Sequence, residues 1–357
     1  MDFGLSEEQE LLQETVRRFV ANECPPPKLR EIFDGKDGYD PQLWAGMLKM
    51  GLGGLVVPEA YGGAELELLD LALVAEVLGA GAVPGPFLGH SLATLVLVLA
   101  GSSEQKERWL PSLASGDALG SVAFGEEGDV WEPAGWSARV ESGKVTGTKT
   151  YVPYAGLADW ILVGVAGGQF AVVPRGGEGV KLEPVAGVDR TRRLDRLTLD
   201  GAPCEVLPES VAGRVRDAGL ILLAADAFGG GTTLVEMSVE YAKTREQFGQ
   251  PIAQFQAVKH RLADMATELE PARGLFWYAA HAFDHIPDEA ERAAALAKAH
   301  ITDRYMQIAR DAVEVHGGIG FTWECDVQIW FKRALFDRTF LGSPAFHRER
   351  AAQLGDW

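Results

Sequence analysis

Two short segments of this chain stand out by residue type, and the first carries side chains suited to holding a phosphate-bearing ligand. The first is residues 241–252, which read Tyr-Ala-Lys-Thr-Arg-Glu-Gln-Phe-Gly-Gln-Pro-Ile. Its Arg245 can direct two parallel N–H donors at one phosphate, and Phe248 offers an apolar contact beside it. A helix end, a Gly-Pro loop and an amphipathic helix would explain the segment structurally, but would not require this order of residues. We therefore interpret it as a binding segment.

The second segment is residues 314–321, Glu-Val-His-Gly-Gly-Ile-Gly-Phe, which follows a helical pattern over residues 296–313. Glycine after a helix is a common left-handed terminator, so Gly317 and Gly318 predict a helix end. His316 comes with no nucleophile and no metal-ligand spacing. We interpret it as a packing or capping residue rather than a catalytic base.

Composition restricts the partners of these segments. The 357 residues carry a net charge of −18, which disfavours nonspecific binding to nucleic acid or to an anionic membrane surface. A phosphate must therefore be held locally, by arginine side chains and backbone N–H groups. The three widely spaced cysteines, Cys24, Cys204 and Cys325, predict neither a disulfide framework nor a metal site. An acidic, polar start without a signal-like apolar run favours the cytoplasm.

The elements that position these segments change type twice along the chain. Helical periodicity dominates residues 1–118, including an apolar helix expected over residues 66–78. Short alternating runs separated by Gly turns occupy residues 119–215, with strands expected at 137–140, 144–152, 160–165, 169–173 and 196–199. Helical periodicity returns over residues 216–357, where a narrow apolar stripe at residues 255–269 predicts a helix bundle or a subunit interface. The chain is thus predicted to be mainly α with a central β domain.

Both segments, together with residues 58–63 (Pro-Glu-Ala-Tyr-Gly-Gly) and 145–150 (Val-Thr-Gly-Thr-Lys-Thr), resemble landmarks of the acyl-CoA dehydrogenase family in order and spacing. The resemblance covers essentially the whole chain. It implies an N-terminal helical domain, a middle β-barrel or sandwich domain and a C-terminal four-helix bundle. It also implies an acyl-CoA substrate, an FAD cofactor and an acceptor such as an electron-transfer flavoprotein. By the same resemblance, the residues that contact FAD bound mainly by a neighbouring subunit are Arg245, Gln247, Phe248, Ile252, Phe255, Gly317 and Gly318. Glu314 replaces the family's usual glutamine, and its carboxylate must turn away from a pyrophosphate.

The catalytic base of the family is not matched. Family members remove an α-proton from the thioester with a glutamate, which must be able to accept a proton. Leu341 stands at the usual position of that glutamate, and Gly219 stands at the second position, used by some members. Neither side chain can act as a base, so we predict no catalytic residue in this chain.

The flavin-ring contacts of the β domain are also altered. The family's Thr-Glu-Pro-Gly-x-Gly-Ser-Asp loop is reduced here to residues 125–129, Gly-Glu-Glu-Gly-Asp. The family's Trp-Ile-Thr beside the flavin ring is replaced by Tyr151, Val152 and Pro153. Proline has neither a hydroxyl group nor an N–H donor, so a hydrogen bond to the ring is lost.

The losses are confined to groups that would serve a subunit's own flavin ring, whereas the groups lent to a neighbour are kept. We therefore expect a hetero-oligomer, α2β2, with a homologous dehydrogenase subunit that supplies the glutamate. Heteromeric enzymes of this kind act on bulky CoA thioesters, including steroid side chains. A self-sufficient homotetramer with a displaced base would need a different carboxylate. Asp226 and Asp337 are the nearest in sequence, although Asp337 is also placed for a surface ion pair with Arg333. A non-catalytic scaffold subunit and an acyl-CoA oxidase are also compatible with the sequence.

Overall fold

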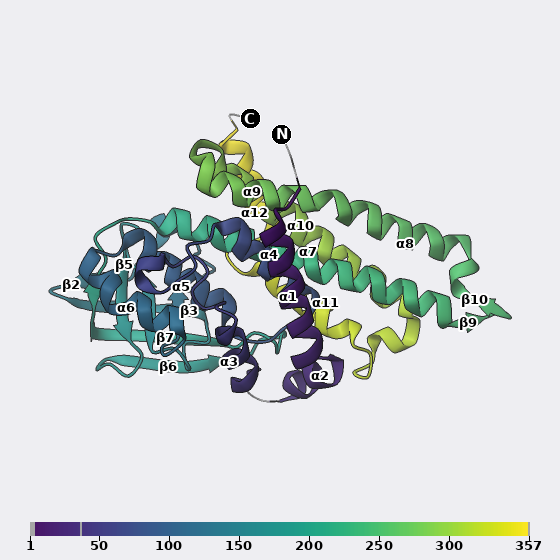
Figure 1. The fold of residues 1–357 in the computed structure, drawn as a ribbon, viewed down its shortest axis with the longest axis horizontal. Helices are drawn as coiled ribbons and strands as arrows, with labels where there is room; N and C mark the ends of the chain where they lie inside the picture. The colour runs from purple at the N-terminus through teal and green to yellow at the C-terminus, as the bar shows by residue number, and fades with distance from the viewer. Residues whose placement is uncertain (1–3, 36–37, 356–357) are drawn as a thin grey trace. The chain divides into compact units, whose positions relative to one another are not determined.

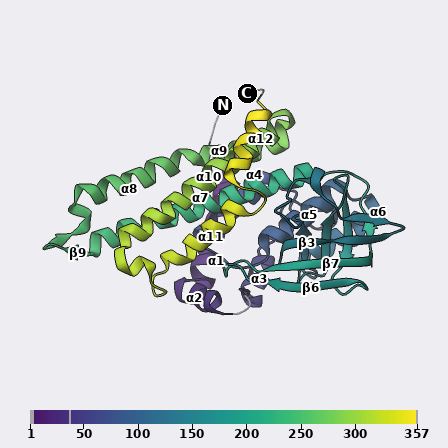
Figure 2. The same cartoon turned by 180° about the vertical axis from the view of Figure 1, so that it is seen from behind.

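A computed structural model describes residues 4–35 and 38–355, shown from two opposite sides in Figure 1 and Figure 2. The helices before the β region are α1 (Glu7–Glu23), α2 (Pro26–Asp34), α3 (Pro41–Lys49), α4 (Leu68–Ala80), α5 (Phe87–Ala100) and α6 (Ser103–Ser115). The helices after it are α7 (Ala212–Thr244), α8 (Gln256–Leu269), α9 (Arg273–His285), α10 (Pro287–His316), α11 (Val327–Thr339) and α12 (Pro344–Gln353). The fold is therefore mainly α with a central β region, as the sequence predicts.

The chain divides into two compact units. The first comprises Met1–Gly35, Ala72–Val83 and Leu220–Trp357, and the second comprises Lys36–Leu71 and Pro84–Gly219. Helices α4 and α7 each run through both units. The predicted domain boundaries, after residues 118 and 215, stay a prediction.

The second unit contains two four-stranded sheets within the described residues. One has the order β1 (Gly120–Ala123), β4 (Trp160–Gly164), β5 (Phe170–Pro174) and β8 (Glu205–Val206). The other has the order β2 (Arg139–Glu141), β3 (Lys144–Pro153), β7 (Leu194–Pro203) and β6 (Val180–Val185). Both sheets bury apolar side chains in one core, of valine, isoleucine, leucine and alanine, including Val145, Ile161, Val173 and Leu197. Valine and isoleucine suit a pleated, buried surface.

The first unit is a helix bundle around α10, which contacts α8, α9, α11 and α12. Helix α10 begins with Pro287 in its first turn and continues through an alanine-rich sequence, both of which favour helix formation. Glycines let α7 approach its neighbours closely. A β-carbon at Gly229 would collide with the backbone of Glu76 on α4, and one at Gly230 would collide with the ring of Tyr305 on α10. Close packing of this kind fixes the position of α7 in the bundle.

Most predicted elements are present, with shifted ends. The apolar helix expected at 66–78 is α4, and the five expected strands correspond to β2, β3, β4, β5 and β7. The sequence analysis missed β1, β6 and β8. Strand β6 does alternate apolar and polar residues, but Pro184 and the flanking glycines make it resemble a loop.

Helix α7 is long and apolar enough to cross a membrane by length and composition, with a mean hydropathy of 1.5 over its most apolar window. However, 83% of that window is buried inside the molecule. Core helices of globular proteins pass the same test, so α7 is weak support for a membrane span.

Candidate functional site

The segment predicted to bind a ligand folds as a hairpin beyond the end of α7. Strands β9 (Glu246–Gln247) and β10 (Gln250–Pro251) pair antiparallel, with Gln247 opposite Gln250. The two residues at the turn, Phe248 and Gly249, both have positive φ angles, of 56° and 80°. Two left-handed residues make the tight turn that matches the twist of a hairpin. Glycine adopts this conformation readily, whereas phenylalanine does so under strain.

The hairpin presents its side chains to solvent. Phe248 is 93% exposed, and its only ring contact among the described residues is edge-to-face with Phe255, at 6.0 Å between centroids. Arg245 is exposed as well, and across residues 4–35 and 38–355 its guanidinium has no hydrogen-bond or ion-pair partner. Gln247 uses its side-chain nitrogen only on the adjacent Glu246 carbonyl, at 2.8 Å. Ile252 is half-buried. The hairpin therefore keeps its donors and its aromatic ring available.

The glycine segment ends α10. Gly317 ends α10 with φ 64° and ψ −141°, which is outside the expected left-handed helical region but is open to glycine, and η5 (Gly317–Phe321) continues as a 3₁₀ turn. A β-carbon at Gly317 or Gly318 would meet no other atom within 4 Å, and the same is true of Gly249 in the hairpin. The backbone at these three glycines is open to an approaching ligand.

A stacked ring pair joins the two segments. Tyr241, on the last turns of α7, lies 4.3 Å from the ring of His316 at an interplanar angle of 25°. His316 Nδ1 donates a hydrogen bond to the Ala312 carbonyl at 2.8 Å, and burial lowers the pKa of its imidazole. His316 is therefore a packed residue that places the glycine turn beside the end of α7.

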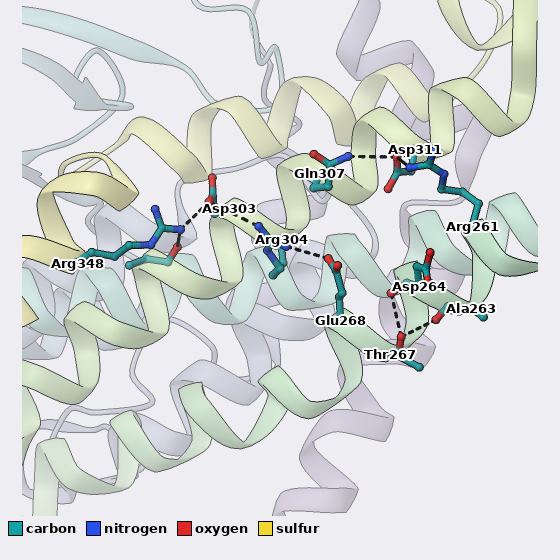
Figure 3. Close-up of polar contacts among 11 residues, drawn as sticks. Arg261, Ala263, Asp264, Thr267, Glu268, Asp303, Arg304, Gln307, Asp311 and Arg348 are labelled. Atoms are coloured by element: carbon teal, nitrogen blue, oxygen red, sulfur yellow. Dashed lines mark hydrogen bonds and ion pairs between the residues drawn. The ribbon is translucent and has the colours of Figure 1, made fainter.

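Glu314 is directed to a cation of the protein. The Arg261 guanidinium of α8 lies 3.9 Å from the Glu314 carboxylate. It also donates a hydrogen bond to Asp311 at 2.8 Å, which Figure 3 shows. The carboxylate that replaces the expected glutamine is thus partly neutralised by Arg261, although Glu314 remains well exposed. This arrangement reduces its repulsion of a nearby phosphate.

The turn at residues 340–342 is where the resemblance places a catalytic carboxylate, and it is tightly held. Leu341 is 0% exposed and has φ 61°, and its carbonyl accepts a hydrogen bond from His347 Nε2 at 2.8 Å. Lys298 of α10 is fully buried and donates to the carbonyls of Phe340, at 2.8 Å, and Asp337. Burial lowers the pKa of Lys298 to about 7. The turn keeps a strained, defined geometry with an apolar side chain in place of a base.

The carboxylates nearest to the vacated positions are engaged elsewhere. Gly219 lies buried inside α7. Asp226 receives two hydrogen bonds from Arg333, at 2.7 Å and 2.5 Å, and both side chains are buried. Asp337 is 0% exposed. The expected location of this ion pair at the surface is therefore wrong, because Asp337 and Arg333 are both buried, and the Arg333 guanidinium is paired with Asp226.

Comparison with known proteins identifies the family. The acyl-CoA dehydrogenase N-terminal domain family matches residues 6–117, and the acyl-CoA dehydrogenase C-terminal domain family matches residues 217–354. The acyl-CoA dehydrogenase IpdE2 of Mycolicibacterium smegmatis is 33% identical over 356 residues, spanning 98% of each chain. This chain belongs to the acyl-CoA dehydrogenase family.

Solved acyl-CoA dehydrogenases share the whole fold. A variant of the Tcur3481–Tcur3483 steroid ACAD superposes with a TM-score of 0.91 and 29% identity, over 98% of both chains. The ChsE4–ChsE5 complex of Mycobacterium tuberculosis gives a TM-score of 0.89 and 30% identity, over 99% of this chain and 98% of that one. Members of the family are FAD flavoproteins.

Among the residues that the resemblance assigns to FAD in this acyl-CoA dehydrogenase, those assigned to the pyrophosphate and adenosine half suit that half better than Pro153 suits the ring. The free guanidinium of Arg245 and the open backbone at Gly249, Gly317 and Gly318 suit a pyrophosphate and a nucleoside. The ring half lacks such groups. Pro153 offers no donor, and its carbonyl already accepts from Ser121 Oγ at 2.5 Å.

The shortened loop of the β unit has turned inward. Glu126 accepts hydrogen bonds from the backbone and hydroxyl of Ser137, at 2.7 Å and 2.6 Å, and from the Ala138 backbone at 3.0 Å. It also pairs with the buried Lys149 at 2.9 Å. Burial alone would raise the pKa of Glu126, but these bonds outweigh it and hold the pKa below its usual range. The carboxylate is thus a structural anchor of the loop.

Lys298, His347 and Tyr241 are the contributors to these sites that the sequence analysis missed. Lys298 gave the clearest signal, since a lone lysine occupies the buried, alanine-rich face of α10, between Ala294 and Ile301. A buried lysine must find acceptors for its protons. Nothing local identifies those acceptors, because they come from residues about forty positions later in the chain.

Proposed function

We propose that this chain is the base-lacking subunit of a heteromeric FAD-dependent acyl-CoA dehydrogenase, assembled as α2β2 with a homologous subunit. In this proposal its hairpin and glycine turn complete the partner's FAD site, and the partner supplies the glutamate base. The observation that carries it is the hairpin itself. Among the described residues, the guanidinium of Arg245 has no hydrogen-bond or ion-pair partner. Phe248, in the same hairpin, is 93% exposed. A large exposed aromatic side chain beside a free arginine is typical of a binding surface.

In the proposed reaction the partner's carboxylate removes the proton α to the thioester. FAD, when bound, would supply the acceptor for a hydride from the β carbon. This chain would contribute binding and position: Arg245 would hold the pyrophosphate with two N–H donors, and the open backbone at Gly317 and Gly318 would hold the adenosine portion. Positioning of this kind changes affinity and orientation without a proton transfer by this chain.

The lack of an available base at the two expected positions supports a heteromer over a self-sufficient enzyme. Leu341 cannot accept a proton, and Asp226 is buried in a two-hydrogen-bond ion pair with Arg333. Freeing Asp226 for catalysis would leave the guanidinium buried and unpaired, which costs about 3–5 kcal/mol. Asp337 is likewise fully buried.

The likeness to a steroid ACAD structure supports a bulky acyl-CoA substrate, including a steroid side chain. An electron-transfer flavoprotein is the proposed electron acceptor, and the cytoplasm is the proposed location. The three cysteines are free thiols, which agrees with a reducing compartment.

The test is to purify the chain alone and together with a candidate homologous dehydrogenase subunit from the same organism. We expect the visible flavin spectrum, and acyl-CoA-dependent reduction of an artificial acceptor, only in the co-purified complex. Stoichiometric flavin and turnover in the isolated chain would contradict the proposal. A complex that forms without flavin would support a non-catalytic scaffold instead.

Arg245→Ala tests the cross-subunit role. A charge-assisted hydrogen bond is worth about 1.5–3 kcal/mol, so we expect the complex to bind FAD about 10- to 100-fold more weakly. Lys243→Ala is the matched control, because Lys243 is exposed nearby and already paired with Glu240 at 2.6 Å. FAD affinity measured by flavin fluorescence should fall in the first variant only. Equal FAD affinities in the two variants would show that Arg245 does not contact the cofactor.

A further inference from the structure

The last turn of α10 carries negative charge where the proposed function needs a phosphate to bind. Glu314 lies in that turn, and its carbonyl accepts the hydrogen bond from the Gly317 backbone N–H that ends the helix. The C-terminus of a helix has a partial negative charge of its own, to which a carboxylate adds. Asp311, one turn earlier, is a second carboxylate of the same helix. A phosphate that approaches the glycine turn therefore meets an unfavourable potential.

Arg261 of α8 is the cation that lies against both carboxylates. Its guanidinium donates to Asp311 at 2.8 Å and lies 3.9 Å from Glu314. Asp311 and Glu314 are three residues apart, which places them on one face of α10. Across residues 4–35 and 38–355, Glu314 has no other ion-pair partner. Its charge is therefore balanced by Arg261 alone.

The two carboxylates differ in how they are held. Asp311 is 6% exposed and also accepts a hydrogen bond from Gln307 at 3.2 Å, as Figure 3 shows. The pKa of Asp311 is raised, chiefly by burial, although Arg261 and Gln307 act against this. The side chain of Glu314 is instead 65% exposed. Asp311 thus anchors the guanidinium from the inside, whereas Glu314 remains accessible to a ligand.

Helix α8 follows the hairpin directly along the chain, through η3 (Ile252–Gln254). The segment that carries the free guanidinium of Arg245 therefore continues into the helix that carries Arg261. In a chain with a net charge of −18, a bound phosphate depends on such local cations. One continuous stretch of sequence supplies one cation without a protein partner and one that faces the carboxylate beside the glycine turn.

We propose that Arg261 is a positioning residue of the FAD site, which acts through Glu314 by cancelling the charge of that carboxylate. This role rests on the proposed function and deepens it, because it explains how a pyrophosphate can bind next to a glutamate. Together, Glu314 and Arg261 have the same net charge as the neutral glutamine that the family usually has at position 314. Unlike a glutamine, two exposed charges are screened by salt.

A double-mutant cycle in the co-purified complex, with FAD affinity measured by flavin fluorescence, tests this role. Arg261→Gln should weaken FAD binding about two- to fivefold, and Glu314→Gln should strengthen it by a similar factor, the range expected for exposed charges. The double variant should return to the wild-type affinity. The gain from Glu314→Gln should also shrink between about 0.1 M and about 1 M salt, where the screening length falls from about 10 Å to about 3 Å.

Two further variants separate charge from packing. Arg261→Lys keeps the positive charge and should keep an FAD affinity close to that of the wild type. Arg304→Gln is the matched control, because Arg304 of α10 pairs with Glu268 of α8 at 3.0 Å and so joins the same two helices, as Figure 3 shows. It lies about 20 Å along α10 from Gly317, so its loss should leave FAD affinity unchanged. Thermal unfolding of each variant reports any loss of packing.

The outcomes distinguish this role from the function on which it rests. If Arg261→Gln weakened FAD binding equally with and without Glu314→Gln, Arg261 would not act through Glu314 and the proposal would be overturned. If Arg245→Ala weakened FAD binding while Glu314→Gln had no effect at either salt concentration, the role of Arg261 would fail and the proposed function would stand. If neither Arg245→Ala nor Glu314→Gln changed FAD affinity, both would fail. Because Glu314 is exposed, Glu314→Gln decides the question without disturbing the buried Asp311.

Discussion

The hairpin turn at Phe248-Gly249 and the turn at Leu341-Gly342 share a positive-φ backbone conformation but place their side chains in opposite environments. In each, a bulky residue takes a left-handed conformation, with φ 56° at Phe248 and φ 61° at Leu341, and a positive-φ glycine follows. Yet Phe248 is 93% exposed and Leu341 is 0% exposed. Left-handed backbone at a residue other than glycine costs about 1–2 kcal/mol and persists where the surroundings enforce it.

The two turns differ in what enforces the strain. The Leu341 turn is held from within, by Lys298 and His347 on consecutive carbonyls. The Phe248 turn is held by a two-residue hairpin, and its side chain gains little from the rest of the molecule. The comparison teaches that the Leu341 turn is enforced by contacts within this chain, whereas the Phe248 turn exposes the side chain for which we propose a partner.

The largest expected effect comes from restoring a carboxylate to the buried turn. Leu341→Glu places an ionisable group where the side chain has no access to solvent, so we expect a loss of about 3–5 kcal/mol in the free energy of unfolding. The isolated variant should still show no acyl-CoA-dependent reduction of an acceptor, because Pro153 cannot hold the flavin ring. Leu341→Met, which conserves volume, should cost less than about 1.5 kcal/mol. Turnover by the isolated Leu341→Glu chain would break the comparison, since the turn would then be a latent catalytic site.

A smaller effect, with a pH signature, is expected at the lysine that holds this turn. Lys298→Met leaves the carbonyls of Phe340 and Asp337 without their donor, at about 1–3 kcal/mol for a buried group. Burial lowers the pKa of Lys298 to about 7 from its ordinary 10.5, so between these values the unfolded chain binds the extra proton. Raising the pH in that window therefore favours the folded state of the wild-type chain, by at most about 1.4 kcal/mol per pH unit relative to the variant.

Urea unfolding of wild type and Lys298→Met at pH 7 and pH 10 measures this difference. The advantage of the wild-type chain should grow with pH. Lys259→Met is the control, because its exposed ammonium has no partner among the described residues and should give no pH-dependent difference. A difference between wild type and Lys298→Met that is the same at both pH values would mean that Lys298 does not hold the turn as a buried amine.

The sequence predicts the outward-facing turn better than the inward-facing one. The hairpin depends on residues that are adjacent in the chain, so Arg245, Phe248 and Gly249 could be singled out from one segment. The Leu341 turn depends on Lys298, about forty residues earlier, and that pairing follows from how α10 and α11 pack. Likewise, Asp337 was expected at the surface because spacing along one helix gives no information about Asp226, which pairs with Arg333 in the interior. Local signals therefore recover the elements and the binding segment, whereas buried polar pairs need the tertiary structure.

The smallest effect on folding is expected at Phe248. A substitution there separates the contribution of the side chain to folding from its contribution to binding. Because 93% of the side chain is exposed and it contacts mainly Phe255, Phe248→Ala should change the free energy of unfolding of the isolated chain by no more than about 0.5 kcal/mol. Alanine keeps the left-handed strain, so Phe248→Gly should instead be slightly stabilising. In the complex the same Phe248→Ala substitution should lower flavin retention during gel filtration, while Leu11→Ala, at an exposed apolar residue of α1 outside both segments, serves as the control. If Phe248→Ala destabilised the isolated chain as much as a core substitution, the hairpin would be part of this chain's own fold. If it left flavin retention unchanged, the strain and exposure at Phe248 would need a partner other than FAD.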